Sequence, residues 1–319
     1  MIYHVGAHET DNAGDIAILD AMHQLLSFLD ADIQKVDDYK LQPYFDAPVV
    51  VGGGGLLLRD SRPNNISDWR WNIGVDALRK INQPIVVFGI GFNQFRGQRP
   101  FTPVFSKHIS ALIEKSVFFS LREKASIKRL KPYVGKLIER IRWQPCPASF
   151  MGRMYETHGK GDYTVFAPAM DRLALRGDIT KIIPVLKQIP NLKIALHIKW
   201  DKRFLNYIDF DCEVVDLRWK PANEIVTFYS RAKQVIGMRL HSCLIPFGFG
   251  VPVIPLISHN KLVDWLEDIG HSDWGVELAQ AEDVIDHLGK DQTDLSMRDK
   301  LYEITKINLK EIRGLLCAK

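Results

Sequence analysis

Short apolar runs recur along the whole chain and alternate with stretches in which apolar residues return every three or four positions. Such runs are typical of buried strands in a parallel sheet, and the longer periodicity is typical of helices. The runs predict strands at 2–6, 33–36, 48–51, 84–88, 117–120 and 137–143, and in the second half at 163–167, 193–198, 212–216, 234–237 and 253–256. This alternation predicts an α/β protein in which each half is a doubly wound, Rossmann-like sheet.

Helical periodicity falls between the predicted strands. It predicts helices from 15 onward, near 103–115, from about 121, near 178–188, 202–207, 221–230 and 242–249, after 261, and at 296–316. The composition becomes polar and weakly periodic at 151–162, where we expect a linker. The resulting organisation is an N-terminal domain at 1–150, a C-terminal domain at 163–295, and a last helix, 296–319, that packs back across the domains.

Composition adds limits to this picture. A length of 319 residues suits two domains, and 46% hydrophobic with 25% charged residues is ordinary for a globular protein. The formal charge of +4 is compatible with an anionic ligand or with loose attraction to an anionic membrane surface. It is too small to argue for nucleic acid as a partner.

Targeting and redox signals are absent from the sequence. The N-terminus lacks a signal-peptide pattern, and no apolar run is long enough to span a bilayer. The four cysteines, Cys146, Cys212, Cys243 and Cys317, lie far apart, so neither a disulfide framework nor a zinc site is implied. We therefore expect a cytoplasmic protein.

We also expect no bound metal, because no histidine pair shares a helix face and His4 and His8 straddle a strand and a loop.

The chemistry concentrates where the strand 234–237 ends. Arg239 and His241 follow it directly, Lys261 follows the next strand, and no Asp or Glu occurs from Gly237 to Val263. Ligands of open α/β sheets bind at the carboxyl ends of strands, and grouped cationic side chains recognise anions. The pattern predicts an anion receptor. The alternative is a buried unit in which Arg239 and His241 only satisfy local carbonyl groups.

Other strand ends carry small or polar residues. Asp15 opens a helix, where it is either a functional carboxylate or a helix cap. Arg122 follows the strand 117–120, and its alternative role is a surface pair with Glu123 or Glu139. The glycine runs at 52–55 and 89–91 allow close approach of a ligand but match neither a Walker A loop nor a dinucleotide fingerprint.

Taken in order, these motifs resemble those of the polysaccharide pyruvyl transferases, over nearly the whole chain. They are Asn12-Ala13-Gly14-Asp15, the glycine run with Leu56-Leu57, Gly89-Ile90-Gly91, Ser120-Leu121-Arg122-Glu123, Gly237-Met238-Arg239-Leu240-His241, Gly250-Val251-Pro252 and Lys261. Two doubly wound domains with facing strand ends describe the GT-B architecture with a central cleft. The resemblance implies an enzyme that moves pyruvate from phosphoenolpyruvate onto two hydroxyls of a sugar, forms a cyclic ketal and releases phosphate, without a further cofactor.

The resemblance also implies roles for single residues. Arg122, Arg239, Leu240, His241 and Lys261 would hold phosphoenolpyruvate, with Asp15 and His241 as the catalytic base and acid. Asn12, Gly14, Gly53, Gly54 and Gly91 would contact the acceptor or shape its loops, which makes the N-terminal domain the acceptor side and the C-terminal domain the donor side. Arginine forks suit carboxylate and phosphate groups, and an imidazole suits proton delivery.

The chain departs from the family pattern in two places. Cys146-Pro147-Ala148 stands where the family usually has Asp-Pro-Ala, and Ser258-His259-Asn260 precedes Lys261 where an aromatic residue is common. Both departures concern acceptor choice more than donor choice. The cysteine is not expected to be a nucleophile, since no base is placed near it in the sequence.

The implied partners are phosphoenolpyruvate and a glycan or lipid-linked saccharide, with peripheral contact at the inner membrane surface as a further expectation. Two other functions stay open. One is a GT-B glycosyltransferase with a nucleotide-sugar donor, although such enzymes often grip the sugar nucleotide with a carboxylate where this chain has Arg239, His241 and Lys261. The other is a non-catalytic anion-binding module of a glycan-assembly complex. Phosphate release from phosphoenolpyruvate with a sugar acceptor distinguishes the three.

Overall fold

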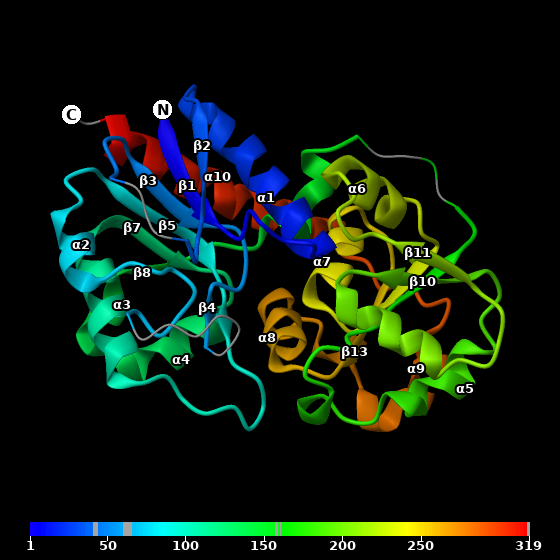
Figure 1. Cartoon of the computed structure of the whole chain (residues 1–319). Coiled ribbons are helices and arrows are strands. Elements are labelled where there is room, and N and C mark those ends of the chain that lie inside the picture. Colours follow the sequence, from blue (N-terminus) through cyan, green and yellow to red (C-terminus); the bar gives the residue numbers. More distant parts are fainter. Residues whose placement is uncertain (41–43, 60–65, 157–158, 160, 318–319) are drawn as a thin grey trace.

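The computed structural model describes residues 1–40, 44–59, 66–156, 159, 161–317, and within this part the strands form two six-stranded sheets and one two-stranded sheet (Figure 1). The first sheet has the order β2-β1-β3-β5-β7-β8 and the second the order β11-β10-β9-β12-β13-β14. The first contains β1 (Ile2–Gly6), β2 (Ile33–Asp37), β3 (Val49–Gly52), β5 (Ile85–Ile90), β7 (Ser116–Leu121) and β8 (Ile141–Trp143). The second contains β9 (Thr164–Ala167), β10 (Leu192–Leu196), β11 (Glu213–Asp216), β12 (Gln234–Gly237), β13 (Val253–Ile257) and β14 (Val276–Glu277), while β4 (Leu57–Leu58) pairs with β6 (Phe92–Asn93).

Helices connect the strands and cover the sheets. The α-helices are α1 (Ala13–Leu26), α2 (Val75–Lys80), α3 (Pro103–Lys115), α4 (Lys124–Val134), α5 (Ile183–Leu186), α6 (Ala222–Ser230), α7 (Leu240–Gly248), α8 (Asn260–Ile269), α9 (Val284–His287) and α10 (Leu295–Cys317). Shorter 3₁₀ segments are η1 (Ser27–Leu29), η2 (Gly135–Arg140), η3 (Pro147–Arg153), η4 (Leu173–Leu175), η5 (Ile179–Ile182), η6 (Lys199–Asn206), η7 (Ser272–Trp274) and η8 (Leu278–Asp283). Among the described helices, none combines the length and apolar composition needed to cross a bilayer.

Strand order determines where each sheet opens for a ligand. The strand pairs of the described residues are all parallel, and the order reverses between β1 and β3 in the first sheet and between β9 and β12 in the second. Connections leave in opposite directions at such a reversal, so the carboxyl ends there form a crevice. The predicted α/β class, with two doubly wound Rossmann-like domains facing each other, is confirmed.

The two halves are joined by a shared apolar core. Buried side chains of α1, such as Met22, belong to the same cluster as Leu244 of α7 and Ile312 of α10. The final helix α10 also makes polar contacts with the first half, where Gln144 Nε2 donates to Thr305 Oγ1 at 2.8 Å and Asn308 Nδ2 donates to the Trp143 carbonyl oxygen at 3.0 Å. Figure 1 shows α10 beside the first sheet and continuing toward α7.

Several predicted boundaries were wrong for local reasons. The strand expected at 137–143 begins only at Ile141, because Gly135 takes a positive φ of 54° and starts the 3₁₀ segment η2. The helix expected at 178–188 is divided into η5 and α5, and the one expected at 202–207 is the end of the 3₁₀ segment η6, which stops at Asn206. The predicted linker, 151–162, begins inside η3, and its residues 157, 158 and 160 lie outside the described part of the chain, as do 318 and 319 of the last helix.

Candidate active site

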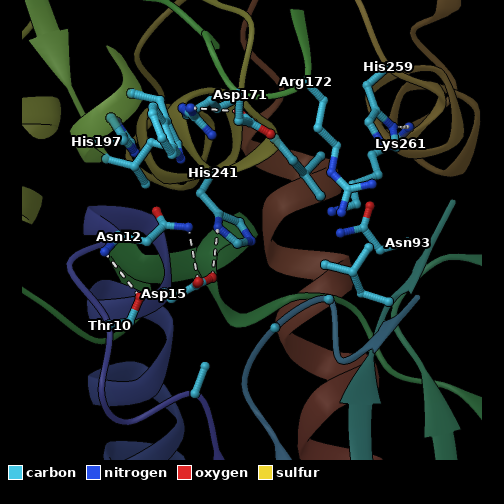
Figure 2. Close-up of a pocket in the computed structure, with 18 of the residues that line it drawn as sticks. Thr10, Asn12, Asp15, Asn93, Asp171, Arg172, His197, His241, His259 and Lys261 are labelled. Carbon is cyan, nitrogen blue, oxygen red and sulfur yellow. Dashed lines mark hydrogen bonds and ion pairs between the residues drawn. The ribbon is translucent and has the colours of Figure 1, made fainter. Parts of the chain in front are cut away.

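A cavity of about 730 Å³ lies between the two sheets, at the carboxyl edges where their strand orders reverse. Loops after β1, β3 and β6 form one wall, and loops after β9, β10, β12 and β13 form the other. Figure 2 shows side chains from both walls pointing toward one another. The lining is Ala7, Thr10, Asp11, Asn12, Asp15, Gly53, Gly54, Gly55, Leu56, Leu58, Arg70, Asn93, Phe95, Met170, Asp171, Arg172, Arg176, His197, Ile198, Lys199, Trp200, Arg203, Met238, Arg239, Leu240, His241, His259, Lys261 and Leu262.

Positive charge predominates in this lining. Among the described residues that line the cavity, seven are Arg or Lys and three are Asp. Cationic groups around a partly enclosed cavity focus the field on its interior and attract anions. The cavity is therefore where we expect the predicted anion receptor. Its positive charge comes from residues outside the segment 237–261 as well as from those within it.

Arg239 is paired with carboxylates, which corrects the expectation that it has none. Its Nη2 donates to Asp201 Oδ1 at 2.6 Å and to Asp171 Oδ1 at 2.8 Å, and its Nε donates to Asp201 Oδ2 at 3.1 Å. Burial alone would lower the pKa of Arg239, but the two carboxylates raise it above its ordinary value. Asp171 follows β9 and Asp201 follows β10, so the sequence on either side of Arg239 gives no sign of these two partners. Only Nη1 of Arg239 has no hydrogen bond to a described residue.

His241 lies between the two halves of the site. Its Nε2 is 3.4 Å from Arg122 Nη1, and its Nδ1 is 3.9 Å from Asp15 Oδ1. Burial lowers the pKa of His241 well below its ordinary value, and Arg122 and Lys261 lower it further, so the free protein holds a neutral ring. Because arginine can only donate, Nε2 is the acceptor and the ring proton lies on Nδ1, facing Asp15.

Asp15 faces the cavity and does not cap its helix, which corrects the alternative role. The cap of α1 is Asn12, whose Oδ1 accepts from the Gly14 amide at 3.0 Å and whose Nδ2 donates to Asp15 Oδ2 at 2.9 Å. Burial raises the pKa of Asp15, although Arg70, Lys261 and Arg122 act against the rise. A carboxylate with a raised pKa beside a neutral imidazole forms a pair between which a proton can pass.

Arg122 is buried rather than on the surface, and it stands behind His241 without lining the cavity. Its Nε donates to Glu123, one of the two surface partners considered for it, while its Nη2 has no partner in the described part of the chain. Cys146 lies beside this group, and burial raises the pKa of its thiol to about 11. A neutral thiol therefore stands where the family usually has a carboxylate, and Arg122 forms its ion pair with Glu123.

Two of the predicted glycines support these side chains from behind and do not line the cavity. A Cβ on Gly14 would lie 2.5 Å from His241 Nδ1, and one on Gly91 would lie 2.5 Å from Arg122 Nη2. A Cβ at either position would therefore force the neighbouring side chain to shift. The two glycines thus let α1 approach α7 and let the loop after β5 approach Arg122.

A second group of polar side chains lies across the cavity from His241. In Figure 2, Arg172 and Lys261 from the second half extend toward Asn93 from the first. No ion pair joins Arg172 or Lys261 to a described carboxylate, and burial, aided by Arg122, lowers the pKa of Lys261 to about 7. Glu123 and Asp15 oppose this lowering, but neither forms an ion pair with Lys261, and a buried amine without an ion-pair partner favours an anionic ligand.

His259 has a different part in this group. Its Nδ1 accepts from the Lys261 amide at 3.1 Å and thereby caps α8, and its ring packs on Phe95 with centroids 4.2 Å apart. Burial lowers its pKa to about 2, so it adds no positive charge near neutral pH.

Eight of the predicted site residues line the cavity, and Gly14, Gly91 and Arg122 contact the residues that do. The eight are Asn12, Asp15, Gly53, Gly54, Arg239, Leu240, His241 and Lys261. Sequence reasoning missed Asn93, Asp171, Arg172, Arg176 and His197. A signal existed for Asp171 and Arg172, because both follow β9, whose carboxyl end lies at the reversal of strand order, but no recognisable motif surrounds them.

Comparison with known proteins decides the family. A family model for polysaccharide pyruvyl transferase matches residues 12–260. The chain belongs to this family. As a member, it is a transferase of polysaccharide biosynthesis, and the family implies a glycan acceptor. The matched range contains Asp15, Arg122, Arg239 and His241. A search of curated protein sequences finds no match.

Solved structures similar to the transferase agree on its fold. The Staphylococcus aureus MnaA–UDP co-structure has a TM-score of 0.55 at 12% identity, covering 100% of this chain and 98% of that one. The Methanocaldococcus jannaschii UDP-GlcNAc 2-epimerase in complex with UDP-GlcNAc and UDP has a TM-score of 0.54 at 10% identity, covering 96% and 99%. Arabidopsis thaliana UGT89C1 complexed with UDP has a TM-score of 0.52 at 10% identity, covering 99% of both chains. At such identities the similarity concerns the GT-B fold alone.

Proposed function

We propose that this polysaccharide pyruvyl transferase uses phosphoenolpyruvate as its donor and forms a cyclic pyruvate ketal on two hydroxyls of one sugar, releasing phosphate. The observation that carries the proposal is the cationic cavity in which Lys261 and Arg172 lack carboxylate partners while His241 and Asp15 lie side by side. A compact donor with a carboxylate and a phosphate matches several cationic groups within one cavity.

The donor would bind through the second half of the chain. Arg172, Lys261 and the Nη1 group of Arg239 are the cationic groups offered to its phosphate and carboxylate, and the backbone amide of Leu240 opens α7, where an anion is stabilised by the helix terminus. Arg122 would act from behind, because its guanidinium contacts His241 and not the cavity.

Proton transfers would pass through Asp15 and His241. A proton added to the methylene carbon of the donor makes its neighbouring carbon electrophilic, and one sugar hydroxyl then adds there and loses its proton. The bond to phosphate breaks, and the second hydroxyl closes the ketal. Two hydroxyl protons are therefore released, and one ends on the new methyl group while the other ends on phosphate.

The roles of the pair follow from their protonation states. Asp15, with its raised pKa, accepts a hydroxyl proton. The donor's negative charge beside His241 raises the pKa of the imidazole from its low value in the free protein, so the ring takes up a proton on binding and delivers it to the donor. Asn12, Gly53 and Gly54 form the wall from which the acceptor would enter.

The acceptor would be a sugar in a polysaccharide or in its lipid-linked precursor, reached at the cytoplasmic face of a membrane. Two exposed tryptophans support peripheral contact with an anionic surface: Trp200, which lines the cavity, is 40% exposed, and Trp219 is 69% exposed. Tryptophan and basic side chains favour the membrane–water interface. The basic side chains near these two residues in the sequence are Lys199, Lys202, Arg203, Arg218 and Lys220. Lys202 and Arg218 pair with Asp216, and Lys220 pairs with Glu224.

The test is phosphate release from phosphoenolpyruvate in the presence of candidate sugar acceptors, with the product examined for a ketal methyl signal by NMR. Acceptor-dependent phosphate release together with a ketal supports the proposal. Transfer from a nucleotide sugar without reaction of phosphoenolpyruvate would support a glycosyltransferase instead. Tight phosphoenolpyruvate binding with no turnover on any acceptor of the panel would support a non-catalytic module.

A further inference from the structure

Three histidines meet in the first half, away from the cavity. His4 belongs to β1, His8 to the loop that follows it, and His23 to the second half of α1. Each offers one ring nitrogen, and these atoms lie within 4.8 Å of one another. His4 Nδ1 is 2.9 Å from His23 Nε2, and His8 Nε2 is 2.9 Å from the carbonyl oxygen of His4. None of the three lines the cavity.

The three rings pack against one another, and their burial favours the neutral form. The rings of His8 and His23 stack at 15° with centroids 5.7 Å apart, and the ring of His4 meets each of them edge-on. Burial lowers the pKa of all three, and the neutral form is the one that binds metals. His4 is fully buried while His8 and His23 are partly exposed, which leaves an entry path from the surface.

Charged groups around the cluster have both signs. Lys35 of β2 lies opposite His4 in the sheet and lowers the pKa of all three rings. The carboxylates of Asp37 and Asp20 act in the other direction on His8 and His23. Carboxylates behind histidine ligands are usual at metal sites, where they orient the rings.

We propose that His4, His8 and His23 bind one divalent transition-metal ion of the zinc class, with a position left open to solvent. Ring nitrogens around a tetrahedral zinc lie about 3.3 Å apart, given Zn–N bonds of about 2.0–2.1 Å. The distance between His4 Nδ1 and His23 Nε2, 2.9 Å, is slightly shorter than that value, and all the ring nitrogens concerned lie within 4.8 Å of one another. Small rotations of His8 and His23, which are partly exposed, would complete the site. A proton shared between His4 and His23 would be displaced by the ion.

The position of the site gives the ion a structural effect on the first half. The loop between β1 and α1 carries Thr10, Asp11 and Asn12 to the cavity, and it starts at the cluster. An ion held by the strand, the loop and the helix would fix the start of this segment and would tie α1 to β1. The inference rests on geometry outside the cavity and does not depend on the proposed reaction.

The test uses full-length protein without an affinity tag, stripped with a chelator and titrated with Co²⁺. We expect one Co²⁺ per chain, with the visible absorption of a tetrahedral nitrogen site, displaced by Zn²⁺. His8→Gln and His23→Gln should each weaken binding at least about tenfold. The matched control is His271→Gln, which removes a partly buried histidine that pairs with Asp294 far from the cluster.

Two results would overturn the site. The first is the absence of saturable binding, and the second is unchanged binding in the double variant of His8 and His23. If either variant does not fold, the imidazole resonances of the wild-type protein decide the matter. Zn²⁺ should shift the ring signals of His4, His8 and His23 and leave that of His271 in place, and unshifted cluster signals would refute the proposal.

Discussion

Lys261 is held in the cavity wall with a pKa of about 7, lowered first by burial and then by Arg122. Its ammonium group is therefore largely neutral above pH 8 in the free protein and takes up a proton when an anion binds. Phosphoenolpyruvate affinity should rise as the pH falls from 9 to 7, by up to about tenfold per pH unit. Calorimetry across this range, in buffers of different ionisation enthalpy, measures both the affinity and the proton uptake.

The comparison variant for this prediction is Lys261→Arg, which stays charged throughout. Its affinity should depend on pH less steeply over the same range, because only the proton taken up by His241 remains linked to donor binding. An equal pH dependence in both proteins would assign the proton uptake to another group.

The Asp15–His241 pair provides a second prediction. His241→Gln keeps a hydrogen-bond donor without a titratable proton, and Asp15→Asn removes the carboxylate while keeping its size. General acid–base catalysis is typically worth about 10²–10⁴ in rate, so each variant should lose turnover on that scale and retain donor binding within about tenfold. Phosphate release measures turnover, and calorimetry measures binding. Turnover near the wild-type rate in the glutamine variant would leave His241 as a ligand only.

Single residues show where sequence reasoning reached its limit. Arg239, His241 and Asp15 could be predicted, because each follows a strand that its apolar run already identified. The carboxylates that pair with Arg239 could not, since Asp171 and Asp201 are joined to it only by the order of strands in the second sheet. The neutral state of His259 was equally hidden, because its burial depends on Phe95 in the other half.

At the scale of elements, α1 and α7 meet through Gly14. Alanine in a helix interior is normally more stable than glycine by about 0.5–1 kcal/mol. At Gly14 the added Cβ would collide with the ring of His241, which stands in the active centre. Gly14→Ala should therefore lower turnover by roughly 10²-fold or more, while the free energy of unfolding changes by less than about 3 kcal/mol. Chemical denaturation and phosphate release give the two quantities.

The matched control is Gly314→Ala in α10, where no atom lies within 4 Å of the added Cβ. It should raise the free energy of unfolding by about 0.5–1 kcal/mol and leave turnover unchanged. Full activity in Gly14→Ala would mean that the helices can separate without disturbing His241.

A helix or strand could be predicted when its own residues carry the pattern that stabilises it. The strand 234–237 and the helix 103–115 were predicted with the observed boundaries, since one is a buried apolar run and the other has Pro103 at its start and a clear apolar face. The segments β4, β6 and β14, each two residues long, have no pattern of their own and exist only because a neighbouring strand pairs with them.

At the scale of the molecule, an ion pair links α4 of the first half to α8 of the second. Both Nη groups of Arg129 donate to the carboxylate of Asp264, which is almost fully buried. Arg129→Met should lower the free energy of unfolding by about 2 kcal/mol, because it leaves the carboxylate without its partner. Adding Asp264→Leu should recover most of that loss.

Urea denaturation of both variants measures this interface, and Lys187→Met serves as the control. Lys187 forms an exposed pair with Asp209, so its removal should change stability by less than about 0.5 kcal/mol. A loss in Arg129→Met no larger than in the control would show that the apolar contacts alone hold the halves together.

The division into two Rossmann-like units could be predicted from periodicity, but the way they meet could not. Contacts between the halves, such as the Ala13 amide with the carbonyl oxygen of His197 at 3.1 Å, join residues far apart in the sequence. Nothing local marks them, so the central cavity followed from the family resemblance and from the rule for strand ends rather than from the residues that close it.

The last helix has a consequence for how the protein is made. Gln144, fully buried in the first half, bonds its side-chain amide to Thr305 and Asn308 of α10. During synthesis, the ribosome releases the N-terminal half long before α10 exists. Until then, the amide of Gln144 and the apolar surface that later meets Ile312 face solvent. While the second half is being translated, these groups of the first half therefore stay unpaired, and the first half completes its packing only when α10 leaves the ribosome.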